Sequence, residues 1–288
     1  VTYFALRLIT ALSLWTGAAS GFEVEDRQVY AATPETSVLR IISTADRAVF
    51  EPIIFAFQKA HPGISVDYTI TGTTDLMQAI YEEGAAFDLA ISSAMDLQTK
   101  LANDGFAQSY SPKDAAELPD WAIWRNQLFA FTQEPAAVVL SRKALAGLPL
   151  PENRQDLIAL IRDNPERFQN KVGTYDIRTS GLGYLYATQD ARTSETYWRL
   201  TEVMGALDVR LYCCSGDMID DLSDGTIAVA YNVLGSYASA RAESQDKIQI
   251  ILPSDFPTTM MRTAMVSADA PLPKPAAAFI RHLVALQS

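Results

Sequence analysis

Basic residues, cysteine and histidine are all scarce in this chain. Its 288 residues include 23 Lys and Arg against 34 Asp and Glu, which gives a formal net charge of −11. Binding to nucleic acid needs a clustered excess of Lys and Arg, and the sequence has no basic run or basic amphipathic helix. The composition therefore argues against a nucleic-acid partner, although it does not fix the charge of any single pocket.

Several catalytic motifs are also missing. The sequence has no G-x-S-x-G nucleophile elbow, no H-E-x-x-H zinc motif and no P-loop pattern. Its only histidines, His61 and His282, fall at the end of one expected helix and within another, where a surface or capping role is the simplest interpretation. We therefore expect a binding protein without catalytic residues, cofactor or metal, and keep an enzyme as the alternative.

The longest apolar stretch opens the chain. Residues 1–20 carry one arginine, an apolar core and a small-x-small ending at Ala18–Ser20. This order is typical of a secretory signal peptide, and the core is shorter than the roughly 20 residues of a membrane-spanning helix. We expect export to the periplasm and a flexible N-terminal segment over residues 21–36.

Repeated strand–loop–helix units follow. The stretches SVLRIIS, ISVDYTI and FDLAIS have strand composition, and each precedes a polar loop and a helical pattern. Three such units in succession favour a parallel sheet flanked by helices. KVGTYDI, DVRLY and TIAVAYN repeat the order later in the chain, and KIQIILP and RTAMVSA are expected strands as well.

The predicted fold class is α/β, with two lobes and a ligand cleft between them. Each lobe is expected to be a mixed, mainly parallel sheet flanked by helices. We assign residues 37–131 plus 255–288 to the first lobe and residues 132–254 to the second. The long extended run LFAFTQEPAAVVLSR suggests a crossing between lobes near residues 132–136, and a second crossing is expected near residues 232–236.

The loops after the expected strands share a chemistry. They read STAD, TGTT, SSAM, RTSG and CCSG. Ser, Thr and Gly are ordinary helix caps, but ligands of open α/β sheets bind beyond the carboxyl ends of the strands. Hydroxyls beside free backbone N–H groups suit a small anion. The expected ligand-binding residues are Ser43, Thr44, Thr71, Gly72, Thr73, Thr74, Ser92, Ser93, Arg178, Thr179, Ser180, Gly181, Cys214, Ser215, Tyr231 and Asn232.

Arginine is the natural partner for an anion in such a cleft. Arg178 precedes TSG at a strand end, so its guanidinium could clamp a carboxylate or phosphate with two hydrogen bonds. A surface salt bridge is the equal alternative. Arg125 and Arg262 are further candidates with less support.

Cys213 and Cys214 are the only cysteines. Without a second cysteine pair or a nearby histidine they make a weak metal motif. We favour two thiols in a ligand loop, with a vicinal disulfide as the alternative, because adjacent Cα atoms lie about 3.8 Å apart, below the usual ~4.4–6.8 Å of a disulfide.

The order of several segments resembles the periplasmic solute-binding proteins of ABC transporters. These segments are SVLRIISTAD, DLAISSAMDLQTKLANDGFA, FTQEPAAVVLSR, TSGLGYLYATQD, DGTIAVAYNVLGSYA and ILPSDF before a last helix. The resemblance covers residues 37–288 and is strongest to the ferric-iron-binding-like branch of the type II fold. It implies a monomer that captures a small ligand and presents it to an ABC permease. Some similar receptors signal instead to a sensor histidine kinase, which is the alternative partner.

The same resemblance bears on the ligand. Ferric-binding members typically carry two adjacent tyrosines where this chain has Tyr231 and Asn232, and their His and Glu ligands are replaced by residues 43–46. An amide oxygen is a poor donor for a ferric ion. We therefore expect Tyr231 and Asn232 to form hydrogen bonds with a small anionic organic or oxyanion ligand. Ferric binding, and a purely structural role for this pair, remain alternatives.

Overall fold

The computed structural model describes residues 21–110, 119–244, 247–255 and 257–286. The expected signal peptide over residues 1–20 lies outside the described residues. Within the described ranges, no helix combines the length and the hydropathy needed to cross a bilayer.

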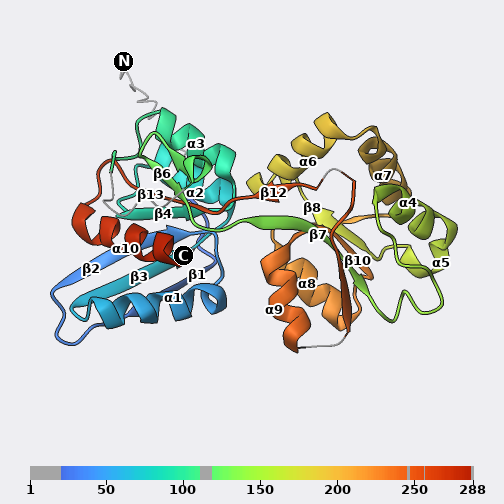
Figure 1. Cartoon of the computed structure of the whole chain (residues 1–288), viewed down its shortest axis with the longest axis horizontal. Coiled ribbons are helices and arrows are strands. Elements are labelled where there is room, and N and C mark those ends of the chain that lie inside the picture. Colours follow the sequence, from blue (N-terminus) through green and yellow to red (C-terminus); the bar gives the residue numbers. More distant parts are fainter. Residues whose placement is uncertain (1–20, 111–118, 245–246, 256, 287–288) are drawn as a thin grey trace, which may run out of the picture.

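Two sheets flanked by helices form two lobes, seen side by side in Figure 1. Lobe 1 is built on a sheet of strand order β1-β3-β2-β4-β13-β6-β5, in which β2 runs parallel to β3 and β4 and the remaining pairs are antiparallel. Its strands are β1 (Asp26–Tyr30), β2 (Ser37–Ser43), β3 (Ile64–Ile70), β4 (Leu89–Ser92), β5 (Ile123–Trp124), β6 (Leu128–Ala130) and β13 (Thr263–Val266).

Lobe 2 has a sheet of order β11-β7-β10-β8-β9. Strand β8 runs parallel to β10 and β9, whereas β7 is antiparallel to β10 and β11. Its strands are β7 (Glu134–Ser141), β8 (Val172–Tyr175), β9 (Arg210–Tyr212), β10 (Val229–Leu234) and β11 (Ile248–Ile251). The α/β class and the two mixed sheets are confirmed, with less parallel pairing than the sequence pattern suggested.

Helices cover both sheets because each buries one apolar face. In lobe 1, α1 buries Phe50, Ile54 and Phe57 as its apolar spacing predicts, and Phe57 packs edge-on against Phe279 of α10 at 4.8 Å between ring centroids. The helices of lobe 1 are α1 (Arg47–Ala60), α2 (Thr73–Tyr81), α3 (Met95–Asn103), α10 (Pro273–Ala285) and the short 3-10 helix η2 (Asp120–Ala122).

The sheet of lobe 2 has a hydrophobic core on each face. Apolar residues of α6, α8 and α9 pack on one face, and those of α4, α5 and α7 pack on the other. The central strand β10 contributes to both cores and is buried along its whole length. The helices are α4 (Arg154–Asp163), α5 (Pro165–Phe168), α6 (Gly181–Thr193), α7 (Glu195–Ala206), α8 (Ser215–Asp224) and α9 (Gly235–Ser244).

The chain crosses between lobes at two places that lie side by side. The first is the step from β6 to β7, within the extended run that suggested it. The second is the segment between β11 and β13, where β12 (Thr259–Met260) pairs with Glu134 and Pro135 of β7. The crossing expected near residues 232–236 is wrong, because those residues end β10 and begin α9 inside lobe 2.

The N-terminal segment is more ordered than the sequence suggested. Residues 21–36 were expected to be flexible, yet residues 26–30 form β1, an edge strand antiparallel to β3. Arg27 donates two hydrogen bonds to the carboxylate of Asp67 on β3, at 2.8 and 2.6 Å. Exposed and more buried residues alternate along this short, charged segment, and it forms a strand by pairing with the edge of β3.

Candidate functional site: an acidic cleft between the lobes

A cleft of about 810 Å³ lies between the two lobes and is lined by residues of both. Most of the expected site residues meet there, since the loops after β2, β3, β4, β8 and β9 all open onto it. Those that line the cleft are Thr44, Thr71, Gly72, Thr73, Thr74, Ser93, Arg178, Thr179, Ser180, Cys214 and Ser215.

Direct hydrogen bonds join the lobes at one wall of the cleft. The backbone N–H of Gly181, the first residue of α6, donates to Thr73 Oγ1 at 2.7 Å. Thr74 Oγ1 donates to the carbonyl oxygen of Thr179 at 2.7 Å, and the backbone N–H of Asp46 donates to the Tyr237 hydroxyl at 3.1 Å. The hydroxyls of Thr73 and Thr74, which were expected to bind ligand, therefore form hydrogen bonds between the lobes.

Three expected site residues lie behind the cleft wall. Ser43 Oγ accepts hydrogen bonds from the Tyr68 hydroxyl and the Ala45 N–H, and Ser92 Oγ accepts from the Ala94 N–H. Gly181 is buried and uses its N–H on Thr73. Each hydroxyl accepts from the backbone N–H two residues further on, so Ser43 and Ser92 close local turns before α1 and α3, and neither is the N-cap of its helix.

Tyr231 and Asn232 also lie outside the cleft lining, in the interior of lobe 2. The Tyr231 hydroxyl and the Asn232 Nδ2 both donate to Asp190 Oδ2 at 2.8 Å. Arg154 donates from Nε to the Tyr231 oxygen at 2.7 Å and from Nη2 to Asp190 Oδ1 at 2.6 Å. The central pair of the expected site thus belongs to a buried hydrogen-bonded network, which we call the Asp190 network.

The backbone explains this placement. The pairing of β10 with β7 shifts register between Ala230 and Val233, so Tyr231 and Asn232 form a bulge, and Asn232 has a positive φ of 63°. In a regular strand neighbouring side chains point to opposite faces, whereas a bulge can turn two toward one partner. The strand also continues to Leu234, so the pair does not stand at its end.

Carboxylates dominate the charge of the cleft. Six of the lining residues are acidic, and Arg178 is the one basic residue among the lining residues. Arg178 donates from Nε and Nη2 to its neighbour Asp176 at 2.8 and 2.6 Å, so its charge is already matched. The acidic lining residues are Glu23, Glu25, Asp46, Asp75, Asp217 and Asp220.

The pKa shifts report the same negative field. Burial raises the pKa of Glu25, and the charges of Asp46, Asp217, Asp75 and Glu23 raise it further. Each carboxylate disfavours ionisation of the next one, as expected for like charges in a partly buried site. The carboxylates therefore give this part of the cleft a negative field, and the expected arginine clamp for an anion is not formed.

The other two candidate arginines do not line the cleft. Arg262 is buried and pairs with Glu134 at 3.3 Å, and its charge partly offsets the effect of burial on the pKa of Asp46. Burial raises the pKa of Glu134, but the Arg262 charge and hydrogen bonds from Ser236 and Thr132 lower it overall. Arg125 lies in lobe 1, where its guanidinium stacks over Trp124.

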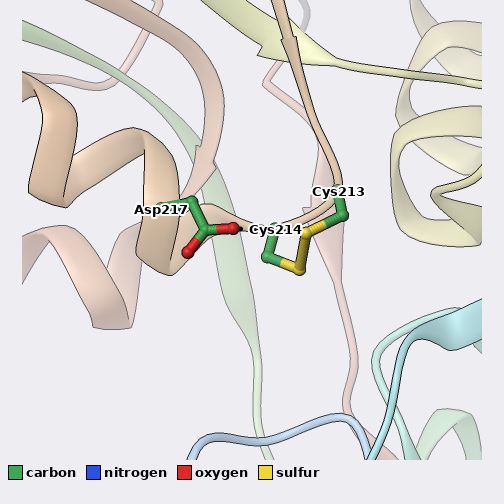
Figure 2. A group of neighbouring side chains, drawn as sticks. All are labelled: Cys213, Cys214 and Asp217. Atoms are coloured by element: carbon green, nitrogen blue, oxygen red, sulfur yellow. Dashed lines mark hydrogen bonds between the residues drawn. A yellow bond between two sulfur atoms is a disulfide. The ribbon is translucent and has the colours of Figure 1, made fainter. Parts of the chain in front are cut away.

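Cys213 and Cys214 form a vicinal disulfide on the cleft wall (Figure 2), with their Cα atoms 3.8 Å apart. The favoured expectation of two free thiols is wrong. The turn from β9 into α8 leaves both side chains facing each other beside the cleft, and Asp217 of the first turn of α8 lies next to them.

None of the six acidic lining residues was among the ligand-binding residues expected from the sequence. Asp46, Asp75 and Asp217 stand within a few residues of the polar loops that it singled out, and the net charge of −11 was available. Glu23 and Glu25 belong to the N-terminal segment that was expected to be flexible. Acidic residues near a helix start are so common as caps that only the meeting of several loops reveals a shared field.

Comparisons with known proteins place this fold in a family. A model of the bacterial extracellular solute-binding proteins matches residues 42–212. The substrate-binding protein of an ABC transporter from Agrobacterium tumefaciens is 32% identical, with a TM-score of 0.88, and the match covers 92% of this chain and 80% of that one. The chain belongs to the bacterial extracellular solute-binding proteins, and the resemblance to type II periplasmic binding proteins is confirmed.

More distant solved structures share the fold alone. Iron-bound HitA from Pseudomonas aeruginosa is 17% identical with a TM-score of 0.69, covering 87% of this chain and 84% of that one. AfuA from Actinobacillus pleuropneumoniae, solved with exogenous fructose-6-phosphate, is 13% identical with a TM-score of 0.74, covering 88% and 81%. The sequence matches no curated protein significantly.

Proposed function

We propose that this protein captures a small organic cation in the periplasm and delivers it to the membrane permease of an ABC transporter. The observation that carries the proposal is the cleft lining of six carboxylates drawn from both lobes. The permease is favoured over a sensor kinase because the A. tumefaciens relative is described as part of an ABC transporter.

A cation gains from this cleft in two ways. It interacts favourably with several carboxylates at once, in a partly buried site where charges are screened less than in water. It also relieves the mutual repulsion that, together with the larger effect of burial, raises the pKa of Glu25. An anion would meet the opposite field, so the anionic ligand expected from the hydroxyl loops is the weaker hypothesis.

The arrangement of the carboxylates favours an organic cation over a metal ion. Among the described residues, three or more ligand atoms of His, Cys, Asp and Glu gather closely enough for one ion only at Cys213, Cys214 and Asp217. The other carboxylates are spread along the cleft, as suits a molecule with separated positive charges. The half-buried ring of Tyr237 also lines the cleft and can pack against an ammonium group.

A ferric ligand is disfavoured by the Asp190 network. Tyr231, where the ferric-binding resemblance would place a ligand, is buried and bonded to Arg154 and Asp190. Burial and the Asp190 charge raise the pKa of the Tyr231 phenol, which opposes the phenolate that a ferric ion requires. The fold shared with iron-bound HitA is therefore no argument for iron binding by this chain.

A thermal-shift panel tests the proposal on untagged protein. The panel compares spermidine, putrescine, choline and arginine with fructose 6-phosphate and ferric citrate. A ligand at about 100 times its Kd stabilises by about 2.7 kcal/mol, so at least one amine should raise the melting temperature by several degrees. A response to the anionic members alone would overturn the cationic ligand and leave the solute-binding fold intact.

A further inference from the structure

The described chain brings three metal-ligating side chains together at one point of the cleft wall. Ligand atoms of Cys213, Cys214 and Asp217 all lie within 4.8 Å of one another. Figure 2 shows the Asp217 carboxylate beside the disulfide, and Cys213 Sγ lies 3.3 Å from Asp217 Oδ2. In the disulfide form the sulfur atoms carry no proton and no negative charge, so this group holds no metal as it stands.

Reduction changes the chemistry of these atoms. A dithiol reductant attacks one sulfur, the S–S bond breaks, and the second thiol of the reductant displaces the mixed disulfide. Two electrons and two protons pass to Cys213 and Cys214, and the reductant leaves as its own disulfide. The cleft wall then carries two thiols beside one carboxylate.

We propose that the reduced Cys213–Cys214 pair and Asp217 form a binding site for a soft or borderline divalent cation such as Zn²⁺. Two thiolates and one carboxylate are a donor set that such ions accept, and three protein ligands leave one position open to water. Binding displaces both thiol protons. This site goes beyond the capture of an organic cation, because it exists only after reduction.

The surroundings favour thiolates and a cation. Cys214 is the N-cap of α8, a ten-residue helix whose positive end favours a thiolate. Asp46 of lobe 1 lies across the cleft from this turn, since a Cβ built on Gly216 would stand 3.2 Å from Asp46 Oδ2. The field of the neighbouring carboxylates, which also acts on Glu25, attracts a divalent ion.

The three side chains are accessible from solvent, as a metal site formed after reduction requires. Cys213 and Asp217 are exposed and Cys214 is half-buried, so both a reductant and an ion can reach the group. Within the described residues, Asp217 has no salt bridge to Lys or Arg in the structure, whereas Asp220 one turn on pairs with Arg241. Asp217 is therefore available as a ligand, and Asp224, exposed at the other end of α8 and outside the cleft lining, provides a matched control.

Cadmium is the probe for this site, because cadmium–thiolate bonds absorb in the ultraviolet. Untagged protein is compared in its disulfide form and after reduction with dithiothreitol that is then removed under argon. The reduced protein should bind one Cd²⁺ per chain with the thiolate charge-transfer band, and Zn²⁺ should displace the Cd²⁺. The disulfide form keeps every carboxylate but should show no such band.

Substitutions then assign the ligands. Cys213→Ser and Cys214→Ser should abolish the two-thiolate band, and Asp217→Asn should weaken Cd²⁺ binding roughly tenfold. Asp224→Asn should leave both the band and the affinity unchanged, because Asp224 does not line the cleft. Melting curves check that each variant is folded.

Equal Cd²⁺ binding by the disulfide and reduced forms, or no thiolate band in the reduced form, would overturn the metal site. An unchanged affinity in Asp217→Asn would remove the carboxylate from the ligand set. Spermidine binding by the disulfide form is measured in parallel, so failure of the metal site and failure of organic-cation capture give different results.

Discussion

The cleft and the Asp190 network are both polar regions, yet their balance of partners differs. The cleft is lined by loops between strands and helices, whereas the network joins the bulge in β10 to α4 and α6. In the Asp190 network every acceptor of Asp190 meets a donor, and the Arg154 charge is matched by Asp190 and Asp255. The cleft lining has six carboxylates and one arginine, Arg178, which is already paired with Asp176. Among the six, Asp220 pairs with Arg241 from outside the lining. A polar group with a complete set of partners is scaffold, whereas an unbalanced field at an accessible surface calls for a ligand.

The largest expected effect is on stability, from breaking the Asp190 network. Asp190→Ala leaves the Arg154 guanidinium, which is 1% exposed, without its main partner. Removing one member of a buried ion pair costs roughly 3–5 kcal/mol, so denaturant unfolding should shift strongly. Spermidine affinity of the folded protein, measured by calorimetry, should be unchanged.

A paired apolar replacement sharpens this result. Arg154→Met combined with Asp190→Leu removes both charges and should recover much of the lost stability, because no buried charge is left unpaired. An Asp190→Ala protein as stable as the parent would show that the network does not stabilise the lobe.

Substitution of Asn232 tests whether this residue belongs to the buried network or to the ligand site. Asn232→Ala removes the hydrogen bond to Asp190 and places a Cβ-bearing residue without a polar side chain at a φ of 63°. A stability loss of about 1–3 kcal/mol is expected, with ligand affinity intact. Asn232→Gly accepts the backbone conformation, so the stability difference between Gly and Ala isolates the strain. Loss of affinity without loss of stability would return Asn232 to the ligand site.

Asp46 is the corresponding test of the cleft. Asp46→Asn removes one carboxylate and should weaken spermidine binding about tenfold, which is about 1.4 kcal/mol. Its stability should not fall, because burial already raises the pKa of Asp46 and penalises its charge. Asp96→Asn is the matched control: burial raises that pKa too, but Asp96 does not line the cleft. Equal effects of the two variants on affinity would contradict cation binding by the acidic cleft.

Acid should weaken cation capture. The pKa values of Glu25 and Asp46 are raised above their ordinary values of 4.5 and 3.8, so both groups take up protons while other carboxylates stay ionised. Spermidine affinity should fall as the pH drops through that raised range. In the free protein these two groups bind protons more tightly folded than unfolded, so their contribution to stability should increase over the same range. Calorimetry at several pH values checks the first trend, and Glu25→Gln should flatten it.

The smallest effect is expected at Arg178. Its guanidinium is largely exposed and bonded to Asp176, so it offers little to a ligand. Arg178→Ala should leave spermidine affinity unchanged or slightly raised. A clear loss of affinity for fructose 6-phosphate in this variant would instead support the anion clamp.

The sequence alone determined the class of fold. The apolar spacing of α1 and the strand composition of β2, β3 and β4 reflect local periodicity, which a single chain displays directly. The hydroxyl loops at strand ends also predicted 11 of the 23 residues that line the cleft, because the carboxyl ends of neighbouring parallel strands share an edge.

Only the tertiary structure decided which polar residues have partners. Tyr231 and Asn232 sit at a bulge, so their direction depends on β7 and on α6, neither of which is near in sequence. Glu25 and Asp217 are 192 positions apart, yet their charges act on each other in the cleft. Periodicity is local and can be read along the chain, whereas the satisfaction of a buried charge is a property of three-dimensional neighbours.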